Sequence, residues 1–119
     1  NKLLKKGYVF FTKIKPNKFL LERRPSEEIL GGLLGFPTTR WAVEKDVPTV
    51  PFKANWTFTN KLVIHQFTHF KLELEIVTAE VENPEFDTSK YMEIKRKNFD
   101  LMALPTLMRK VYQQAIKLP

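Results

Sequence analysis

Short apolar stretches alternate with polar segments along the chain, and their pattern predicts several strands followed by one helix. Residues 7–14 (GYVFFTKI) and 19–23 (FLLER) are rich in aromatic and aliphatic residues, as is typical of buried strands. Between them, residues 15–18 combine a proline with an asparagine, which favours a turn. The sequence therefore predicts a β-hairpin over residues 7–24, followed by a polar loop at 24–28.

A longer segment, residues 62–81, is rich in Val, Ile, Leu, Phe and Thr. A typical strand has about 5–6 residues, so we expect an interruption, and polar residues intrude at 66–69. The second half alternates with period two, which predicts a half-buried strand. Its apolar residues face one way and its charged residues the other: Leu72, Leu74 and Ile76 against Lys71, Glu73 and Glu75.

The remaining pattern predicts one short strand and one C-terminal helix. Residues 91–94 form the strand candidate after a polar loop at 82–90. Pro105 suits the first helical position, and apolar residues then recur at helical spacing: Leu107, Met108, Val111, Tyr112 and Ala115. Two prolines exclude a long helix from residues 38–53, leaving at most a short helical turn at 40–45. This order predicts an α+β domain with a sheet that is at least partly antiparallel.

Glycines interrupt the apolar segment 30–37 (LGGLLGFP). They indicate backbone that packs closely against other backbone or that bends with positive φ. A phosphate-binding loop is the competing interpretation, but the segment lacks both the GxGxxG spacing and the lysine of a P-loop. Close packing is therefore the favoured interpretation.

Composition limits the kinds of protein this chain can be. Its 119 residues support a single domain, 1–119, and the absence of cysteine excludes disulfides, thiolate metal sites and cysteine nucleophiles. No apolar run approaches the ~20 residues that span a bilayer. The formal net charge of +7 favours nucleic acid as a partner, although solubility alone explains it equally well. The first residue is Asn1, so we expect a fragment of a larger protein, and its N-terminal lysines suit a linker as well as a binding surface.

Candidate catalytic and metal-binding residues are few. His65 and His69 are the only histidines, and in a strand or loop four residues span about 13 Å. No acidic or cysteine ligand near them completes a zinc site. Ser26 and Ser89 lie in polar segments without a recognisable base. Neither metal binding nor nucleophilic catalysis is expected.

Several ordered motifs together resemble one family. They are the strand 19–24, the glycine segment 30–37, residues 63–70 (VIHQFTHF) with the alternating strand 72–76, and residues 103–111 (ALPTLMRKV). This set, which covers nearly the whole chain, resembles the C-terminal domain of the adenine DNA glycosylases of the MutY family. That domain is similar in fold to the Nudix pyrophosphohydrolase MutT.

The resemblance implies a Nudix-like mixed sheet sandwiched by helices and a role in recognising 8-oxoguanine paired with adenine in duplex DNA. In the family, a loop between two strands, reading Phe-Ser-His or close variants, makes this recognition. The matching residues are Phe67, Thr68 and His69, and Thr68 keeps the hydroxyl of the commoner serine. A tight polar connection without a ligand is the alternative for this trio. Lys71, Arg109 and Lys110 are candidates for phosphate contacts, although the last two equally suit an exposed helix surface.

Other residues depart from the Nudix hydrolases. Residues 37–39 (PTT) replace the Pro-Gly-Gly turn, and residues 39–58 hold only Glu44 and Asp46 as acids. We therefore expect no metal, no cofactor and no catalysis in this chain. The resemblance places the adenine-excising domain and its iron–sulfur cluster in a separate N-terminal part of a cytoplasmic, nucleoid-associated bacterial protein. A Nudix pyrophosphohydrolase and a purely structural docking domain remain the alternative functions.

Overall fold

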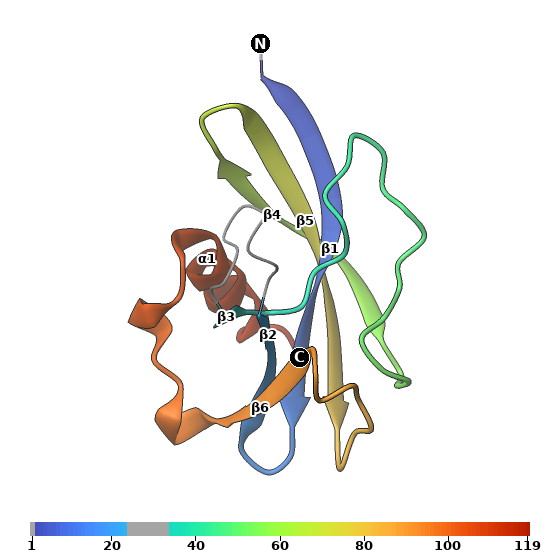
Figure 1. The fold of residues 1–119 in the computed structure, drawn as a ribbon, viewed down its shortest axis with the longest axis vertical. Coiled ribbons are helices and arrows are strands. Elements are labelled where there is room, and N and C mark those ends of the chain that lie inside the picture. The colour runs from blue at the N-terminus through green and yellow to red at the C-terminus, as the bar shows by residue number, and fades with distance from the viewer. Residues whose placement is uncertain (1, 24–33) are drawn as a thin grey trace.

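The computed structural model describes residues 2–23 and 34–119. Their fold is built on one mixed β-sheet (Figure 1). The strands within those ranges are β1 (Leu3–Ile14), β2 (Lys18–Arg23), β3 (Leu34–Gly35), β4 (Thr57–Gln66), β5 (Phe70–Val81) and β6 (Tyr91–Lys95). Two 3₁₀ helices, η1 (Arg96–Asn98) and η2 (Leu101–Ala103), precede the helix α1 (Thr106–Ala115). The strand order is β3–β2–β1–β5–β4, with β6 paired to β2. The expected α+β class is confirmed.

The two longest strands, β1 and β5, lie parallel at the centre of the sheet. Their register runs from Leu3 opposite Phe70 to Ile14 opposite Val81. Strand β1 therefore begins at Leu3, so Lys5 and Lys6 belong to the sheet and the linker interpretation is wrong for them. The other pairs, β1–β2, β2–β3, β2–β6 and β4–β5, are antiparallel. The predicted hairpin of β1 and β2 is thus confirmed.

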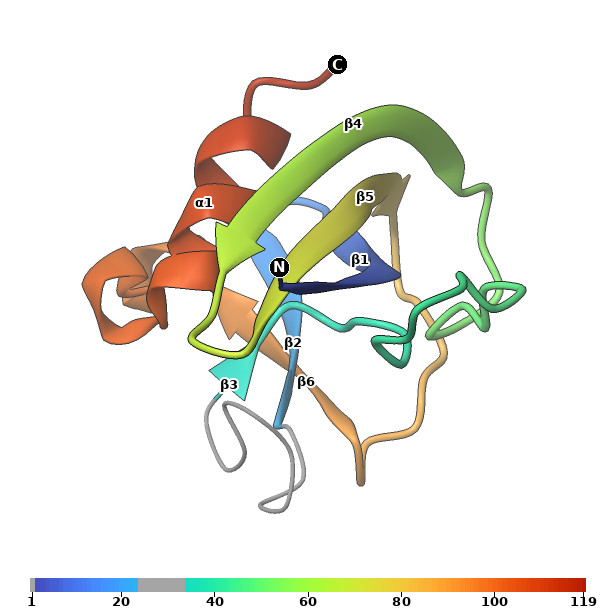
Figure 2. The same ribbon diagram turned by 90° about the horizontal axis from the view of Figure 1, so that it is seen from above.

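The helix α1 covers one face of the sheet, as Figure 2 shows from above. It begins at Thr106, one residue after the expected Pro105. Four of the five predicted apolar positions are fully buried and Tyr112 is partly buried: Leu107, Met108, Val111 and Ala115 lie in the core with Phe11, Phe19, Leu72 and Leu74. A buried side chain of this size contributes about 2 kcal/mol, so this stripe holds α1 on the sheet.

The opposite face of the sheet is covered, in the described residues, by a non-helical segment. Phe52 and Trp56 close over Phe10 and Leu20 on this face, with the Phe10 and Trp56 ring centroids 5.3 Å apart. The expected second layer of helix is therefore not found in the described part of the chain. Within that part, no helix is long and apolar enough to cross a membrane.

An extended segment pairs with β1 as far as Ala42 and residues 43–44 then bend, so the short helical turn expected at 40–45 is wrong. Lys6 and Ala42 exchange two backbone hydrogen bonds of 2.7 and 3.1 Å, which pair this segment with the free edge of β1. The predicted solvent face of β5 also differs, because Glu75 is only 7% exposed. Lys45 reaches it from just beyond the bend, with Nζ 2.9 Å from the carboxylate. This ion pair allows the charge to be buried.

Strand β4 begins at Thr57, five residues before the expected apolar run. A shift of register between Phe58 and Leu62 marks a bulge, where Asn60 adopts a φ of 60°. Asparagine tolerates this left-handed conformation. The polar residues of the bulge hid the start of the strand from the hydrophobic pattern.

Only the end of the glycine segment, residues 34–37, lies in the described part of the chain. A Cβ added to Gly35 would approach the Met108 side chain to 3.2 Å. Close packing is confirmed at this glycine, although its neighbour is a side chain of α1 and not backbone. The interpretation of residues 30–33 falls outside the described residues.

Candidate nucleic-acid interface

The β4–β5 turn brings the three residues of the matching motif together. Gln66 pairs with Lys71, and the Phe67 amide donates to the Phe70 carbonyl at 2.8 Å. Thr68 and His69 alone form the tip of this tight hairpin, and both are exposed. The strand break expected at 66–69 is confirmed, because β4 ends at Gln66 and β5 begins at Phe70.

Phe67 lies at the base of the tip and is half-buried. Its ring centroid is 4.8 Å from those of Phe70 and His65, and it stacks on Trp41 at 5.8 Å. Trp41 arrives on the extended segment that pairs with β1. The aromatic cluster therefore braces the tip, and Phe67 acts in that brace.

Unlike the half-buried Phe67, Thr68 and His69 are exposed, and their side chains make no hydrogen bond to another described residue. Their positions at the apex of the hairpin leave the hydroxyl and the imidazole open to solvent. The hydroxyl offers one donor and two acceptor sites, and a neutral imidazole offers one of each. A braced turn thus presents polar groups that a nucleobase edge can use.

Three ammonium groups surround the base of this tip. Lys2 Nζ donates to the Phe67 carbonyl and the Gln66 side chain, both at 3.0 Å. Lys5 Nζ lies 4.6 Å from the centroid of the Phe70 ring. Lys110, from α1, donates to the Ile64 carbonyl at 3.2 Å. None of the three pairs with a carboxylate in the described residues, so their charge is available to phosphates.

His65 links α1 to the base of the hairpin. Lys110 Nζ lies 3.0 Å from His65 Nδ1, and an ammonium group can only donate. Nδ1 is therefore the acceptor and the imidazole is neutral, with its proton on Nε2. Burial lowers the pKa of His65, and the positive charge of Lys110 lowers it further.

The other expected phosphate contacts are less well placed. Arg109 donates to the Thr106 hydroxyl at 2.9 Å and lies along α1. Lys71 is in β5 and faces away from α1, because it alternates with Phe70 and Leu72. Sequence reasoning missed Lys2, Lys5, Trp41 and His65 as neighbours of the tip. The only signal was weak, namely the N-terminal lysines and the histidine four residues before His69.

The described residues do not fit a divalent-metal site of the Nudix hydrolase kind. Within residues 2–23 and 34–119, no three His, Asp or Glu side chains lie close enough together to hold a metal ion. Asp46 is occupied by Arg40, whose guanidinium donates to both carboxylate oxygens at 3.0 and 3.1 Å. These hydrogen bonds lower the pKa of Asp46. The carboxylates of the described residues are therefore not arranged for metal-assisted hydrolysis of a diphosphate.

Comparison with known proteins agrees with the fold. The family model described as the NUDIX domain matches residues 8–114. The C-terminal domain of mouse MUTYH, solved in complex with human PCNA, superposes with a TM-score of 0.69 at 16% identity, over 94% of this chain and 87% of that one.

Two further solved structures share the fold at low sequence identity. The NUDIX domain of NrtR from Shewanella oneidensis, complexed with ADP ribose, has a TM-score of 0.57 at 17% identity, over 97% of this chain and 89% of that one. The Nudix hydrolase RenU from M. smegmatis has a TM-score of 0.51 at 12% identity, over 95% and 83%. No curated protein sequence matches the chain. The family match extends from β1 through almost all of α1, and the chain belongs to the NUDIX domain family.

Proposed function

We propose that this chain is a lesion-recognition domain that binds 8-oxoguanine opposite adenine in duplex DNA. The observation that carries the proposal is the braced hairpin tip, where Thr68 and His69 are exposed and without side-chain partners in the described residues, above a ring of three ammonium groups. The fold of the C-terminal domain of mouse MUTYH, which this chain shares, supports the same function.

The chemistry of the lesion suits the tip. Compared with guanine, 8-oxoguanine has a proton on N7 and a carbonyl oxygen on C8. The Thr68 hydroxyl can accept from the N7–H, and an imidazole N–H of His69 can donate to the new oxygen. Guanine offers neither group in that arrangement, so it leaves at least one of the two side chains without its partner. Phe67 supports this pair from below.

The proposal includes a division of labour within a larger protein. This domain supplies specificity, while a separate catalytic domain of an adenine glycosylase, with its iron–sulfur cluster, would excise the adenine in the bacterial cytoplasm. A pyrophosphohydrolase is less favoured, because the described carboxylates do not gather into a metal site.

A binding titration tests the proposal. The chain is titrated into labelled duplexes that carry either an 8-oxoguanine:adenine or a guanine:adenine pair, and anisotropy reports the two dissociation constants. Loss of a hydrogen bond to a neutral group costs about 0.5–1.5 kcal/mol, so Thr68→Val should reduce the preference for the lesion about twofold to tenfold. We expect a similar reduction for His69→Ala.

Thr88→Val is the matched control, because Thr88 is also exposed but lies in the loop after β5, at the other end of that strand from the tip. It should leave the preference unchanged. If Thr68→Val and His69→Ala both keep the full preference of the parent chain, the assignment of the tip is wrong. A parent chain without any salt-sensitive duplex binding would instead indicate a structural docking domain.

A further inference from the structure

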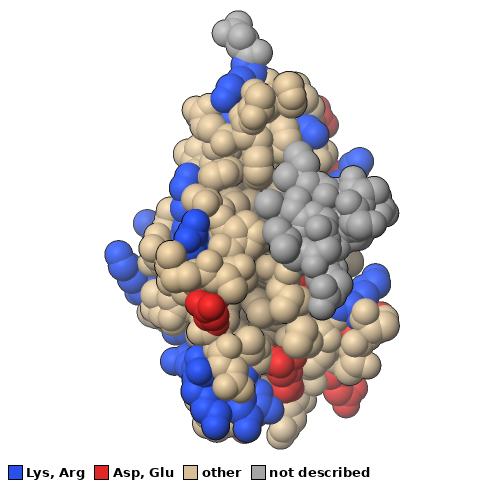
Figure 3. Space-filling model, turned by 60° about the vertical axis from the view of Figure 1, so that its left-hand side comes forward, with Lys and Arg blue, Asp and Glu red and all other residues tan. Residues whose placement is uncertain are grey.

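Basic side chains lie along the α1 side of the molecule, from the β4–β5 hairpin to the opposite end. Figure 3 shows blue side chains along this face and gathered at its lower end. We call Lys110, Lys117, Lys13, Arg96 and Lys97 the basic track. Within the described residues, none of these five forms an ion pair with a carboxylate. The nearby acids at the lower end are taken by other lysines, since Glu93 pairs with Lys18 and Glu80 with Lys15.

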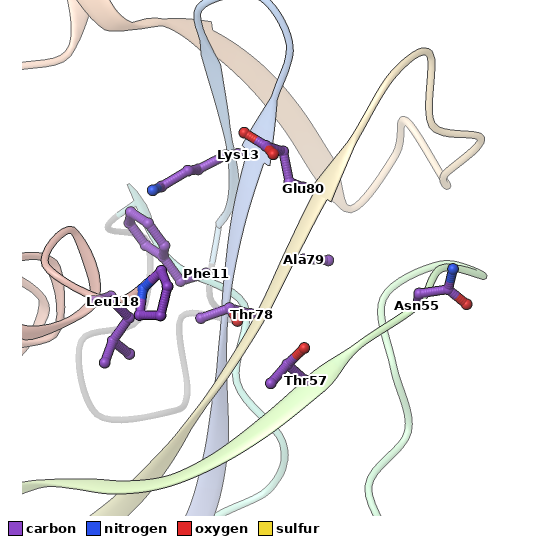
Figure 4. Close-up of a pocket in the computed structure, with 10 residues that line it drawn as sticks. Phe11, Lys13, Asn55, Thr57, Thr78, Ala79, Glu80 and Leu118 are labelled. Carbon is purple, nitrogen blue, oxygen red and sulfur yellow. The ribbon is translucent and has the colours of Figure 1, made fainter.

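Neighbouring parts of the fold carry the members of the track. Lys110 touches His65 beside the hairpin, and Lys117 follows the C-terminal end of α1. The next residue, Leu118, lines a cavity of about 210 Å³ together with Lys13. Figure 4 shows the Lys13 side chain extending over Phe11 toward the α1 side of this cavity.

The lower end of the track is rigidly placed. The Arg96 amide donates to the Asn17 carbonyl at 2.7 Å, which ties η1 to the β1–β2 turn. The Arg96 guanidinium lies 5.0 Å from the centroid of the Phe19 ring, and Phe19 pairs with Lys13 in the sheet. A cation held over an aromatic face loses little conformational freedom when it meets an anion. Arg96 is therefore ordered in advance of any ligand.

The length of the track matches a DNA duplex. The hairpin lies beside the start of β1 and the Arg96 end lies beside its last residues (Figure 1). Twelve residues of strand at a rise of about 3.3 Å span about 36 Å, and ten base pairs at about 3.4 Å span nearly the same distance.

We infer that the duplex bound at the β4–β5 hairpin crosses the α1 side of the molecule in the direction of β1, and that Arg96 and Lys97 contact its phosphates about ten base pairs from the tip. The inference rests on the proposed function for the position of the lesion, but not for the contact with phosphates. The alternative partner for the basic track is a protein segment rich in Asp and Glu. Its binding would not require the distance of about ten base pairs between the tip and Arg96.

The test compares Arg96→Gln/Lys97→Gln with Lys53→Gln/Lys90→Gln, which removes the same charge from exposed lysines away from the track. Both variants of the 119-residue chain are titrated with two undamaged DNA duplexes. One has twenty base pairs, and the other has six base pairs closed by a DNA loop. Each phosphate contact contributes about 0.9 to the slope of log K against log salt. We expect the track variant to lose between about 1 and 2 of that slope, and about tenfold or more in affinity at low salt, on the long duplex only.

Several results would overturn the inference. An unchanged slope on the long duplex, a loss equal to that of the control, or an equal loss on the six-base-pair duplex would each exclude a distant phosphate contact. Loss of binding to a polyglutamate peptide with unchanged duplex binding would assign the track to an acidic protein. Lesion preference is measured separately with the Thr68 and His69 variants. A chain without that preference whose slope still depends on Arg96 and Lys97 would refute the proposed function while leaving the track in place.

Discussion

Gly7 allows the extended segment that carries Trp41, and so braces the β4–β5 hairpin, to approach β1. A Cβ built at this position would lie 3.0 Å from the Thr39 hydroxyl oxygen, 3.2 Å from the Arg40 carbonyl oxygen and 3.2 Å from Leu74 Cδ2. The Tyr8 amide donates to the same Thr39 hydroxyl at 2.9 Å. The φ of Gly7 lies outside the left-handed region, so packing alone opposes a side chain. Gly7→Ala should therefore push this segment away from β1.

The expected cost follows from two opposing effects. Overpacking costs about 1–3 kcal/mol, and replacing glycine by alanine in the unfolded chain returns about 0.4–1 kcal/mol. The backbone oxygen of Arg40 cannot move cheaply, so we expect a net destabilisation of about 1–2 kcal/mol. For a chain of this size that corresponds to a melting temperature lower by roughly 4–8 °C.

Urea and thermal unfolding measure this cost, and two further variants test its cause. In Gly35→Ala the three nearest atoms all belong to the flexible Met108 side chain, so this matched control should lose less stability. Thr39→Ala removes the closest atom to the new Cβ, and the double variant should be more stable than the sum of the single effects by about 0.5–1 kcal/mol. If Gly7→Ala keeps or raises the stability of the parent, or if the two changes simply add, close packing at Gly7 is not the reason for glycine.

Two other predictions concern His65 and the β4 bulge. Because the folded state lowers the pKa of His65, the unfolded chain binds this proton first, and the free energy of unfolding should fall as pH drops below the ordinary value of 6.5. Urea titrations between pH 5 and 8 should show this loss, and a His65→Gln chain with an equal slope would contradict it. At the bulge, Asn60→Val forces a β-branched residue to a φ of 60° and should cost about 1–3 kcal/mol, whereas Asn60→Gly should be nearly neutral. Equal melting temperatures for the two variants would refute strain at this position.

Under the proposed function, the aromatic brace gives a physical reason why a tip of two residues would be selective. Trp41, Phe67 and Phe70 pack below the turn, so ordering of Thr68 and His69 is largely achieved before a ligand arrives. A flexible loop would lose that free energy on binding. We therefore expect substitutions in the brace to lower the free energy of unfolding. Substitutions of Thr68 or His69 should change the selectivity for the lesion and leave that free energy unchanged.

Local patterns in the sequence were sufficient to predict the hairpin of β1 and β2, the buried stripe of α1 and the break between strands that contains Thr68 and His69. Each depends on residues within about ten positions of one another, where alternation, helical spacing and turn residues act directly. The pattern failed at the β4 bulge, because Asn60 and its neighbours are polar inside a strand. It also failed at residues 40–45, which form no helical turn because the edge of β1 pairs with Ala42 and residues 43–44 bend.

Tertiary structure alone decided what surrounds the tip. Lys2 reaches Phe67 across 65 positions of the chain and Lys110 reaches Ile64 across 46, since the parallel pairing of β1 with β5 places the N-terminus beside the β4–β5 turn. Glu75, which alternation placed in solvent, is buried because Lys45 arrives to neutralise it. Periodicity encodes which face of an element is apolar, but ion pairs and charged surfaces depend on which elements become neighbours.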